Sequence, residues 1–211
     1  MTSIADRQAL WSRPSGVVAI SFDATVDARC ESAALAGALR FIVEETSFAE
    51  PSELGEAMIR FALAPTRSPA ATRATVTLRI PGVDPLVLTR TSSECAVVVE
   101  KKSFGAVDVL FETPACGVYL ERVAAGQTLP AHVHQRIDES ELVLDDGLLL
   151  QGVAVAAGMA HRWPRQFAHR YDNPTTRELA FLCIDRPSFI PSDETVVADA
   201  PLVAITARRY F

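Results

Sequence analysis

Two stretches of sequence decide the fold: GQTLPAHVHQRIDE, residues 126–139, and GMAHRWPRQFAHRYDN, residues 158–173. In a β-strand successive side chains point to opposite faces, so His132 and His134 would project to the same side. Both imidazoles would then reach one ion. The spacing of four side chains would let a small β-barrel hold one divalent metal ion: His132, His134, Glu139 and His169.

Composition limits the possible partners. The 211 residues (22.8 kDa) are 49% apolar and 22% charged, enough to bury the core of one large or two small domains. A formal charge of −6 and a pI near 5.3 argue against a surface that binds nucleic acid or anionic lipid. We therefore expect neither a nucleic-acid nor a membrane partner.

No targeting or redox signal stands out. No apolar run approaches the roughly 20 residues that a membrane span needs, and the opening MTSIADRQALWSRP lacks the order of a secretion signal. The four cysteines are scattered, with no C-x-x-C pair that would indicate a zinc knuckle or a thioredoxin-like site. We expect packed, reduced thiols in a cytoplasmic protein.

The segment PGVDP, residues 81–85, separates two stretches of different periodicity. Before it, β-forming residues 17–26 and 71–80 flank two segments whose apolar residues have helical spacing. This order of strand, helix, helix and strand predicts an α+β domain over residues 1–84, with two helices on a short antiparallel sheet.

After the break, short β-rich runs follow one another with turn signals between them. Such spacing is typical of a closed or two-sheet barrel. The last candidate strand lies at residues 202–206. The sequence thus predicts an all-β domain over residues 85–211.

The two opening stretches resemble the paired motifs of the cupin family. The first resembles G-x5-H-x-H-x4-E followed by a glycine, with one extra residue before Gly147. The second resembles G-x5-P-x-G-x2-H-x3-N, with Gln166 where the family has glycine. The family is a double-stranded β-helix, and the resemblance implies that the metal ligands are His132, His134, Glu139 and His169.

Alternatives remain for this site. Some cupins have lost their metal, and the histidines would then be ordinary hydrogen-bonded residues. Glu141 has the strand parity of Glu139 and is the obvious substitute ligand. His161, the remaining histidine, is expected to be structural or at the rim.

Three neutral imidazoles and one carboxylate would leave a divalent ion with a net charge of about +1 and two open octahedral positions. A bidentate anionic metabolite suits both the charge and the vacancy. Nitrogen and oxygen ligands without thiolate favour iron or manganese, with zinc or nickel as alternatives. The metal would act as a Lewis acid or activate water or dioxygen.

Other pocket residues follow from strand parity. Tyr171 should face the same interior as His169, so its phenol is a candidate catalytic proton donor or hydrogen-bond anchor, although it could equally be packing. Tyr119, Glu121 and Trp163 are candidates for pocket walls, with core filling as the alternative.

A second resemblance covers residues 17–83. The segments CESAALAGALRFIVEETSFAEPSELGEAMIRFALA (30–64) and ATVTLRIPG (74–82) resemble the later part of dihydroneopterin aldolase, a tunnelling-fold family. That resemblance implies two antiparallel helices across a sheet. Since tunnelling-fold proteins complete their barrels by oligomerising, it also implies a homo-oligomer.

The functional positions of that family are poorly kept. Cys30 replaces a tyrosine, Ser52 replaces the pterin-anchoring glutamate, with Glu50 and Glu53 nearby, and Arg79 and Ile80 stand where a catalytic lysine precedes a proline. We interpret this domain as serving assembly.

Three functions follow from the sequence. The first is a metal-dependent cupin oxygenase or isomerase acting on a small anionic metabolite. The second is a non-catalytic cupin that binds or senses a small ligand. The third is a dihydroneopterin aldolase-type pterin enzyme with an appended barrel.

Overall fold

A computed structural model describes residues 1–67, 70–198 and 207–211. The chain divides into two compact units, Met1–Val98 and Val99–Phe211. The break that the sequence suggested after residue 84 falls within the first unit, because residues 81–85 form part of the loop between two paired antiparallel strands.

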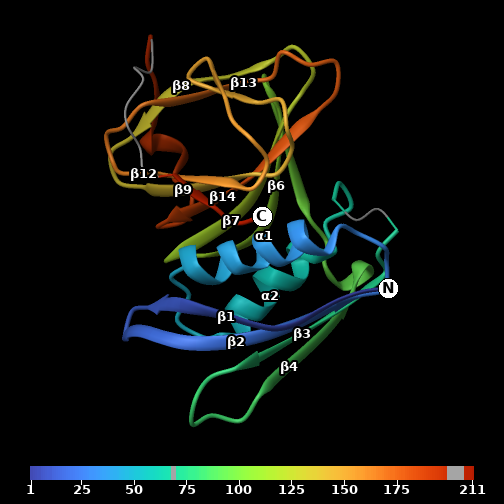
Figure 1. Ribbon diagram of the computed structural model, residues 1–211. Coiled ribbons are helices and arrows are strands. Elements are labelled where there is room, and N and C mark those ends of the chain that lie inside the picture. Colours follow the sequence, from blue (N-terminus) through green and yellow to red (C-terminus); the bar gives the residue numbers. More distant parts are fainter. Residues whose placement is uncertain (68–69, 199–206) are drawn as a thin grey trace. The chain divides into compact units, whose positions relative to one another are not determined.

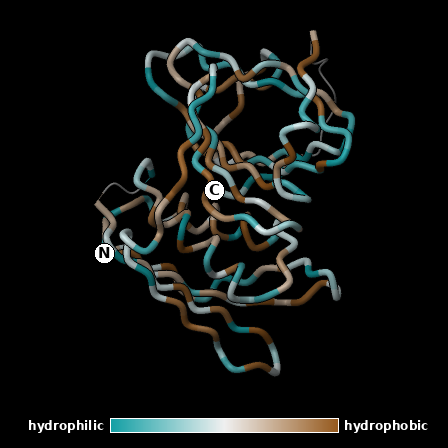
Figure 2. Tube along the Cα trace, turned by 180° about the vertical axis from the view of Figure 1, so that it is seen from behind, coloured by the Kyte–Doolittle hydropathy of each residue, from teal (hydrophilic) through white to brown (hydrophobic). Residues whose placement is uncertain are grey.

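The first unit is a four-stranded antiparallel sheet with two helices packed on it (Figure 1). The order is β1-β2-β3-β4. The elements are β1 (Thr2–Arg13), β2 (Gly16–Val26), α1 (Ser32–Glu45), α2 (Pro51–Ala62), β3 (Arg73–Arg79), β4 (Leu86–Thr91) and the short 3-10 helix η1 (Ser92–Glu94). Along β2 the residues Phe22, Ala24 and Val26 are buried, while those between them are partly exposed. Figure 2 shows the corresponding mixture of brown and teal along the sheet.

Helix α2 begins with a capping box that uses two glutamates. The Glu50 side chain accepts a hydrogen bond from the backbone N–H of Glu53, and the Glu53 side chain accepts one from the backbone N–H of Glu50 at 3.0 Å. Such reciprocal bonds satisfy N–H groups that a helix start leaves unpaired. The two acidic residues nearest to Ser52 therefore have a structural role.

The second unit contains two antiparallel sheets. The seven-stranded sheet has the order β16-β12-β9-β14-β7-β6-β5, and the five-stranded sheet has the order β11-β10-β13-β8-β15 (Figure 1). The strands are β5 (Val98–Lys102), β6 (Gly105–Thr113), β7 (Cys116–Val123), β8 (Thr128–His134), β9 (Asp138–Val143), β10 (Leu149–Leu150), β11 (Val153–Ala154), β12 (Met159–Trp163), β13 (His169–Asp172), β14 (Leu179–Arg186), β15 (Glu194–Val196) and β16 (Ala207–Arg209), with the 3-10 helix η2 (Pro191–Asp193) before β15.

Eight strands in the middle of these sheets have the order of a double-stranded β-helix. Counting from β7, the first, third, sixth and eighth strands form one sheet, and the second, fourth, fifth and seventh form the other. Strands close in sequence thus alternate between two facing sheets, which place their inward side chains in one interior. This order supports the predicted cupin barrel.

The predicted fold class must be corrected. The part of the chain that the structure describes is mainly β, with sixteen strands in three antiparallel sheets and two α-helices, rather than an α+β domain on a short sheet followed by a barrel. The first sheet is not short, since β1 and β2 have 12 and 11 residues. Within the described residues a distinct tunnelling-fold domain is not evident.

Two further points concern the sequence expectations. Within the described ranges no helix is long and apolar enough to cross a membrane. The candidate strand at residues 202–206 lies outside the described residues.

Candidate metal centre

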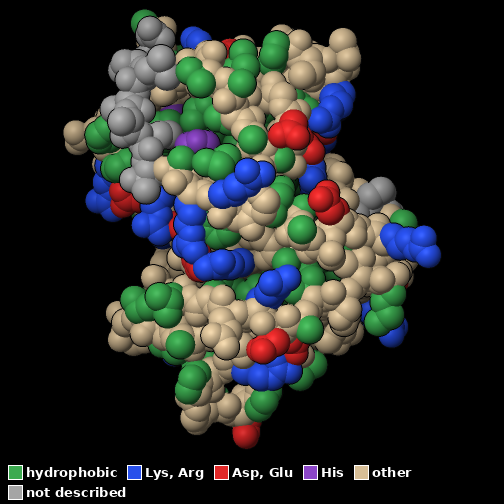
Figure 3. Space-filling model, viewed as in Figure 1, with side chains coloured by type: hydrophobic (Ala, Val, Ile, Leu, Met, Phe, Trp, Pro, Cys, Tyr) green, Lys and Arg blue, Asp and Glu red, His purple; other side chains and the backbone are tan. Residues whose placement is uncertain are grey.

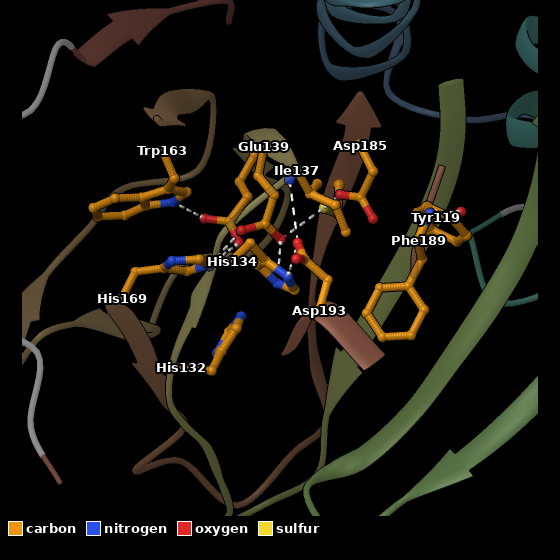
Figure 4. A network of polar contacts seen from close by, with 12 residues as sticks. Tyr119, His132, His134, Ile137, Glu139, Trp163, His169, Asp185, Phe189 and Asp193 are labelled. Atoms are coloured by element: carbon orange, nitrogen blue, oxygen red, sulfur yellow. Dashed lines mark hydrogen bonds and ion pairs between the residues drawn. The ribbon is translucent and has the colours of Figure 1, made fainter. Parts of the chain in front are cut away.

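The two sheets of the second unit bring the four predicted ligands together (Figure 4). His132 and His134 lie on β8, and His169 lies directly opposite His132 on the neighbouring β13. Glu139 lies on β9 in the facing sheet. All four side chains are buried, with relative exposures of 6% or less, and Figure 3 shows only a small area of histidine surface among hydrophobic side chains.

The ligand atoms lie close to one another. Nε2 of His169 is 3.2 Å from Oε2 of Glu139, and Nε2 of His134 is 3.6 Å from Oε1 of the same carboxylate. The ring centroids of His132 and His169 are 4.2 Å apart. One donor atom from each of His132, His134 and Glu139 falls within 4.8 Å of the others.

Hydrogen bonds at the far side of two rings fix which nitrogen faces the centre. Nδ1 of His132 lies 2.9 Å from the carbonyl oxygen of Pro130, and Nδ1 of His169 lies 3.4 Å from that of Phe167. A carbonyl only accepts, so each Nδ1 carries a proton, and Nε2 is the nitrogen left to bind a metal. Among the described residues, buried Nε2 of His169 has no hydrogen-bond partner. A buried ring nitrogen without a hydrogen bond, beside a carboxylate, fits a metal ion.

A carboxylate from the C-terminal segment approaches the third ring. Oδ2 of Asp193, in η2, lies 3.7 Å from Nδ1 of His134. The same oxygen accepts the backbone N–H groups of Arg136 at 2.9 Å and Ile137 at 3.2 Å. Asp193 thus ties the loop after β8 to the ring of His134. Carboxylates in this position orient metal-binding histidines in many proteins.

Burial sets the protonation of the ligands. It lowers the pKa of His132 to about 3 and that of His134 to about 4, and the neighbouring His169 adds to both effects. Both rings are therefore neutral near pH 7, as metal binding requires. Burial raises the pKa of Glu139 well above its ordinary value, and the nearby carboxylates of Asp185, Glu141 and Glu121 add to this shift. A cation at the centre would offset this repulsion.

A second carboxylate, Glu141, approaches the metal-facing nitrogen of His169. Oε2 of Glu141 accepts hydrogen bonds from the indole N–H of Trp163 and from the Tyr171 hydroxyl at 2.9 Å, and its Oε1 is 3.5 Å from Nε2 of His169. Burial opposes ionisation, but His169 and the two donors lower the pKa of Glu141. Trp163 also stacks on His169, with ring centroids 4.6 Å apart.

Tyr171, the candidate proton donor, is fully buried and contacts Glu141. Its ring stacks on Phe181 at 4.4 Å, and its hydroxyl binds Glu141. It is not among the residues that line the cavity beside the metal centre. Its contacts are those of a residue that supports Glu141. His161 is buried rather than at the rim, and it lies opposite Glu141 on the neighbouring strand β9.

The second motif is held by backbone features as well as by its histidine. Gly158 has a φ of +84°, and a Cβ there would lie 2.3 Å from the carbonyl oxygen of Phe211. Gln166 has a φ of +70°, the left-handed region that favours the glycine of the family motif. The Asn173 amide donates hydrogen bonds to the carbonyls of Val123 and Arg177, both at 2.8 Å, and so fastens two loops.

A cavity of about 130 Å³ adjoins the metal centre. His132, His134 and Glu139 form one wall. The predicted wall residues Tyr119 and Glu121 also line it, whereas Trp163 does not. The other lining residues are Glu100, Lys102, Phe104, Val107, Val109, Glu112, Leu129, Asp185, Phe189 and Glu194.

Sequence reasoning missed two acidic residues of this region, Asp185 and Asp193. Asp185 ends a strand, LAFLCIDR, that is otherwise almost wholly apolar, and an acidic residue in such a run is a usable signal. Asp193 lies in a segment without a periodic pattern, so no comparable signal marks it.

Comparisons with known proteins give only distant similarities. No family model and no curated protein matches the sequence. Among solved structures, the chain is similar to the capsular polysaccharide assembling protein CapF from Staphylococcus aureus, with a TM-score of 0.44 and 15% identity over 48% of this chain and 32% of CapF. It is also similar to a protein with a double-stranded β-helix domain from Klebsiella pneumoniae (TM-score 0.41, 17% identity, 50% of this chain and 87% of that one).

A third similarity is to oxalate decarboxylase from Bacillus subtilis, with a TM-score of 0.40 and 16% identity over 50% of this chain and 30% of that one. The matched region thus spans about a third of the length of CapF and of the decarboxylase. The assignment of the second unit depends on its own strand order and donor set, which support a metal-binding cupin barrel.

Proposed function

We propose that the second unit is a metal-dependent cupin enzyme, an oxygenase or isomerase, that acts on a small metabolite through an anionic, metal-chelating group. One observation carries this proposal: three buried imidazoles and one buried carboxylate converge beside a cavity, and Nε2 of His169 has no hydrogen-bond partner among the described residues. Such an arrangement is costly to bury unless it binds something.

The residues have distinct roles in this proposal. His132, His134, Glu139 and His169 would hold the ion, and Pro130 and Phe167 would keep two of the rings in the metal-binding tautomer. Asp193 would orient His134 from the far side of its ring, whereas Glu141 lies beside the metal-facing Nε2 of His169. When bound, the metal supplies Lewis acidity or activates water or dioxygen. Iron or manganese suits the nitrogen and oxygen donors best, with zinc or nickel as alternatives.

The cavity gives the ligand a partly apolar wall. Phe104, Val107, Val109, Leu129 and Phe189 line it beside the polar groups. Apolar walls with a few convergent polar groups are typical of small-molecule sites. They also limit water beside the metal, which strengthens electrostatic interactions with a bound ligand.

Elemental analysis of the purified protein tests the metal site. Wild type should contain close to one equivalent of metal, and His134→Ala should contain almost none. His161→Ala is the matched control, because His161 is equally buried but lies outside the donor set. Wild type without metal, even after reconstitution with Fe²⁺ or Mn²⁺, would refute the proposal.

Turnover distinguishes the enzyme from a binding protein. Oxygen uptake and product formation by the metal-loaded protein, measured over a panel of small chelating acids, should disappear in His134→Ala. Binding of a chelating acid that stays chemically unchanged would instead favour the alternative of a non-catalytic ligand-binding or sensing cupin.

We also propose a cytoplasmic homo-oligomer. None of the four cysteines forms a disulfide in the structure, as expected in a reducing compartment. Light scattering that gave a 22.8 kDa species would refute the oligomer.

A further inference from the structure

We propose that the substrate carries a positively charged group, such as an ammonium, at the end opposite its metal-binding group. This inference rests on the proposed function, since it takes the anionic end of the ligand to lie at the metal. It adds that the ligand is amphoteric rather than a simple di- or polycarboxylate.

The charges around the cavity carry the inference. Among the described residues that line it are one ammonium, that of Lys102, and six carboxylates: Glu100, Glu112, Glu121, Glu139, Asp185 and Glu194. A divalent ion would compensate Glu139 through the metal centre, but the other carboxylates line the remainder of the space. A second anionic group on the ligand would therefore meet carboxyl groups and no uncompensated cation among the described lining residues, which disfavours it relative to an ammonium.

The single ammonium does not change this balance. Nζ of Lys102 lies 2.8 Å from Oε2 of Glu100, and both side chains are partly exposed. Lys102 is thus already compensated within the cavity wall. Its Nζ is also 5.9 Å from the ring centroid of Phe189, a weak cation–π contact.

Glu121 is the residue that we assign to the positive group. It lies on β7, and its neighbours in register are Val107 on β6 and Phe181 on β14, neither of which can donate a side-chain hydrogen bond. In the described part of the chain its carboxylate forms no hydrogen bond or salt bridge. A partly buried carboxylate without a partner lacks the compensation that such groups normally find.

The surroundings of Glu121 support this role. Burial, followed by the charges of Glu141, Asp185 and Glu194, raises the pKa of Glu121 well above its ordinary value, while Lys102 acts in the opposite direction. The shift means that the ionised form of Glu121 lacks compensation, and Asp185, which is 3% exposed, lines the same cavity. A ligand ammonium beside Glu121 would stabilise the ionised carboxylate and form a charge pair with it.

Matched small probes test the inference without knowledge of the natural ligand. Mn²⁺-loaded protein is mixed with 3-aminopropanoate, 4-aminobutanoate or 5-aminopentanoate, and separately with succinate, glutarate or adipate, the diacids of matching length. Paramagnetic broadening of probe proton signals reports binding close to the metal. The best amino acid should bind wild type at least about tenfold more tightly than its matched diacid, the effect of one well-formed charge pair.

Variants assign the effect to Glu121. Glu121→Gln should remove the preference with little change in shape, and Glu121→Lys should reverse it in favour of the diacid. Glu178→Gln removes the same unit of charge from a residue that pairs with Arg122 and does not line the cavity, so it should leave the preference unchanged. Thermal melts of each variant check that it is folded.

Other outcomes have a clear meaning. A diacid that binds wild type as tightly as the amino acid, or a preference that survives in Glu121→Gln, would overturn the inference. The same holds if Mn²⁺ is bound but no amino acid is broadened. If wild type fails to bind Mn²⁺ at all, the proposed function itself fails, which separates the two cases.

Discussion

The four-stranded sheet and the seven-stranded sheet differ in the kind of side chain that they bury. In the four-stranded sheet, the buried alternate residues of β2 and β3 are apolar, for example Phe22 and Leu78. In the seven-stranded sheet, the neighbouring strands β9 and β14 bury Glu139, Glu141 and Asp185. The strands of both sheets pair in antiparallel ladders, so the difference lies in the side chains.

This difference separates stability from function. Burying an apolar side chain contributes about 1.5–3 kcal/mol to folding, whereas a buried carboxylate without a counter-charge costs free energy. The first sheet therefore has the composition of a supporting core. The seven-stranded sheet buries carboxylates where apolar side chains would stabilise it more, as expected of a surface selected to bind a ligand.

The largest expected effect is on the stability of the four-stranded sheet, whose buried residues are apolar. Phe22→Ala should lower the free energy of unfolding by about 3–5 kcal/mol, because it leaves a cavity at a fully buried position. Metal content should not change. Urea unfolding can be followed separately in the two units, since Trp11 lies in the first and Trp163 in the second.

Single-tryptophan variants provide the control for this experiment. With Trp163 replaced by phenylalanine, the Trp11 transition should shift to lower urea in Phe22→Ala. A loss of metal in Phe22→Ala at low urea would contradict the separation of roles.

On the polar side, Asp185→Asn should stabilise the metal-free protein, by about 2–4 kcal/mol at pH 8. Burial raises the pKa of Asp185 from 3.8 to about 7. A hydrogen bond from Cys183 opposes this shift, and the charge of Glu141 adds to it. Between roughly pH 4 and pH 7 the folded protein then holds more protons at this site than the unfolded chain does. The stability of wild type attributable to Asp185 therefore falls as the pH rises through that window.

Urea unfolding of metal-free wild type and Asp185→Asn at several pH values measures this effect. The gain in the variant should be largest at pH 8 and should shrink towards pH 4. An equal gain at both ends would mean that packing, and not ionisation, distinguishes the two proteins.

A smaller effect is expected behind the metal centre. Asp193→Asn should weaken metal binding by about 10–100-fold, because it weakens the carboxylate partner of His134 while leaving all four ligands. Competition with a metal-binding dye measures the affinity. Asp172→Asn is a control on β13, since Asp172 binds Thr128 and Arg170 rather than a ligand. An unchanged affinity in Asp193→Asn would show that Asp193 does not support His134 and serves only to bind the backbone of the loop after β8.

The sequence predicted some of this arrangement because some of it is local. Two histidines on one strand face the same way by strand parity alone, so the side on which His132 and His134 lie was accessible from spacing. Strand parity tells which face a side chain is on, but not how deeply it is buried. Tyr171 faces inward as expected, but its ring packs on Phe181 and its hydroxyl binds Glu141, because cross-strand neighbours decide how deep a side chain lies.

Two other features could not be read from local patterns. Strand β1 was missed because a register shift between Ile4 and Arg7, with Asp6 at a φ of +44°, interrupts the alternation that marks a strand. The approach of Asp193 to His134 joins residues far apart in sequence through the pairing of β15 with β8. Long-range pairing of short strands has no signature within a single segment.

The smallest expected effect concerns the one glycine that the second motif lacks. Gln166→Gly should stabilise the protein by about 0.5–1 kcal/mol, because relief of the left-handed strain of about 1–2 kcal/mol exceeds the entropy that glycine adds to the unfolded chain. The backbone N–H of Gln166, which lies 2.6 Å from the carbonyl oxygen of His134, should keep its hydrogen bond. Gln166→Ala retains the strain and should change stability by less than about 0.5 kcal/mol. If alanine and glycine stabilise equally in thermal melts, the side chain and not the backbone conformation explains the departure from the motif, and the turn before His169 is not strained.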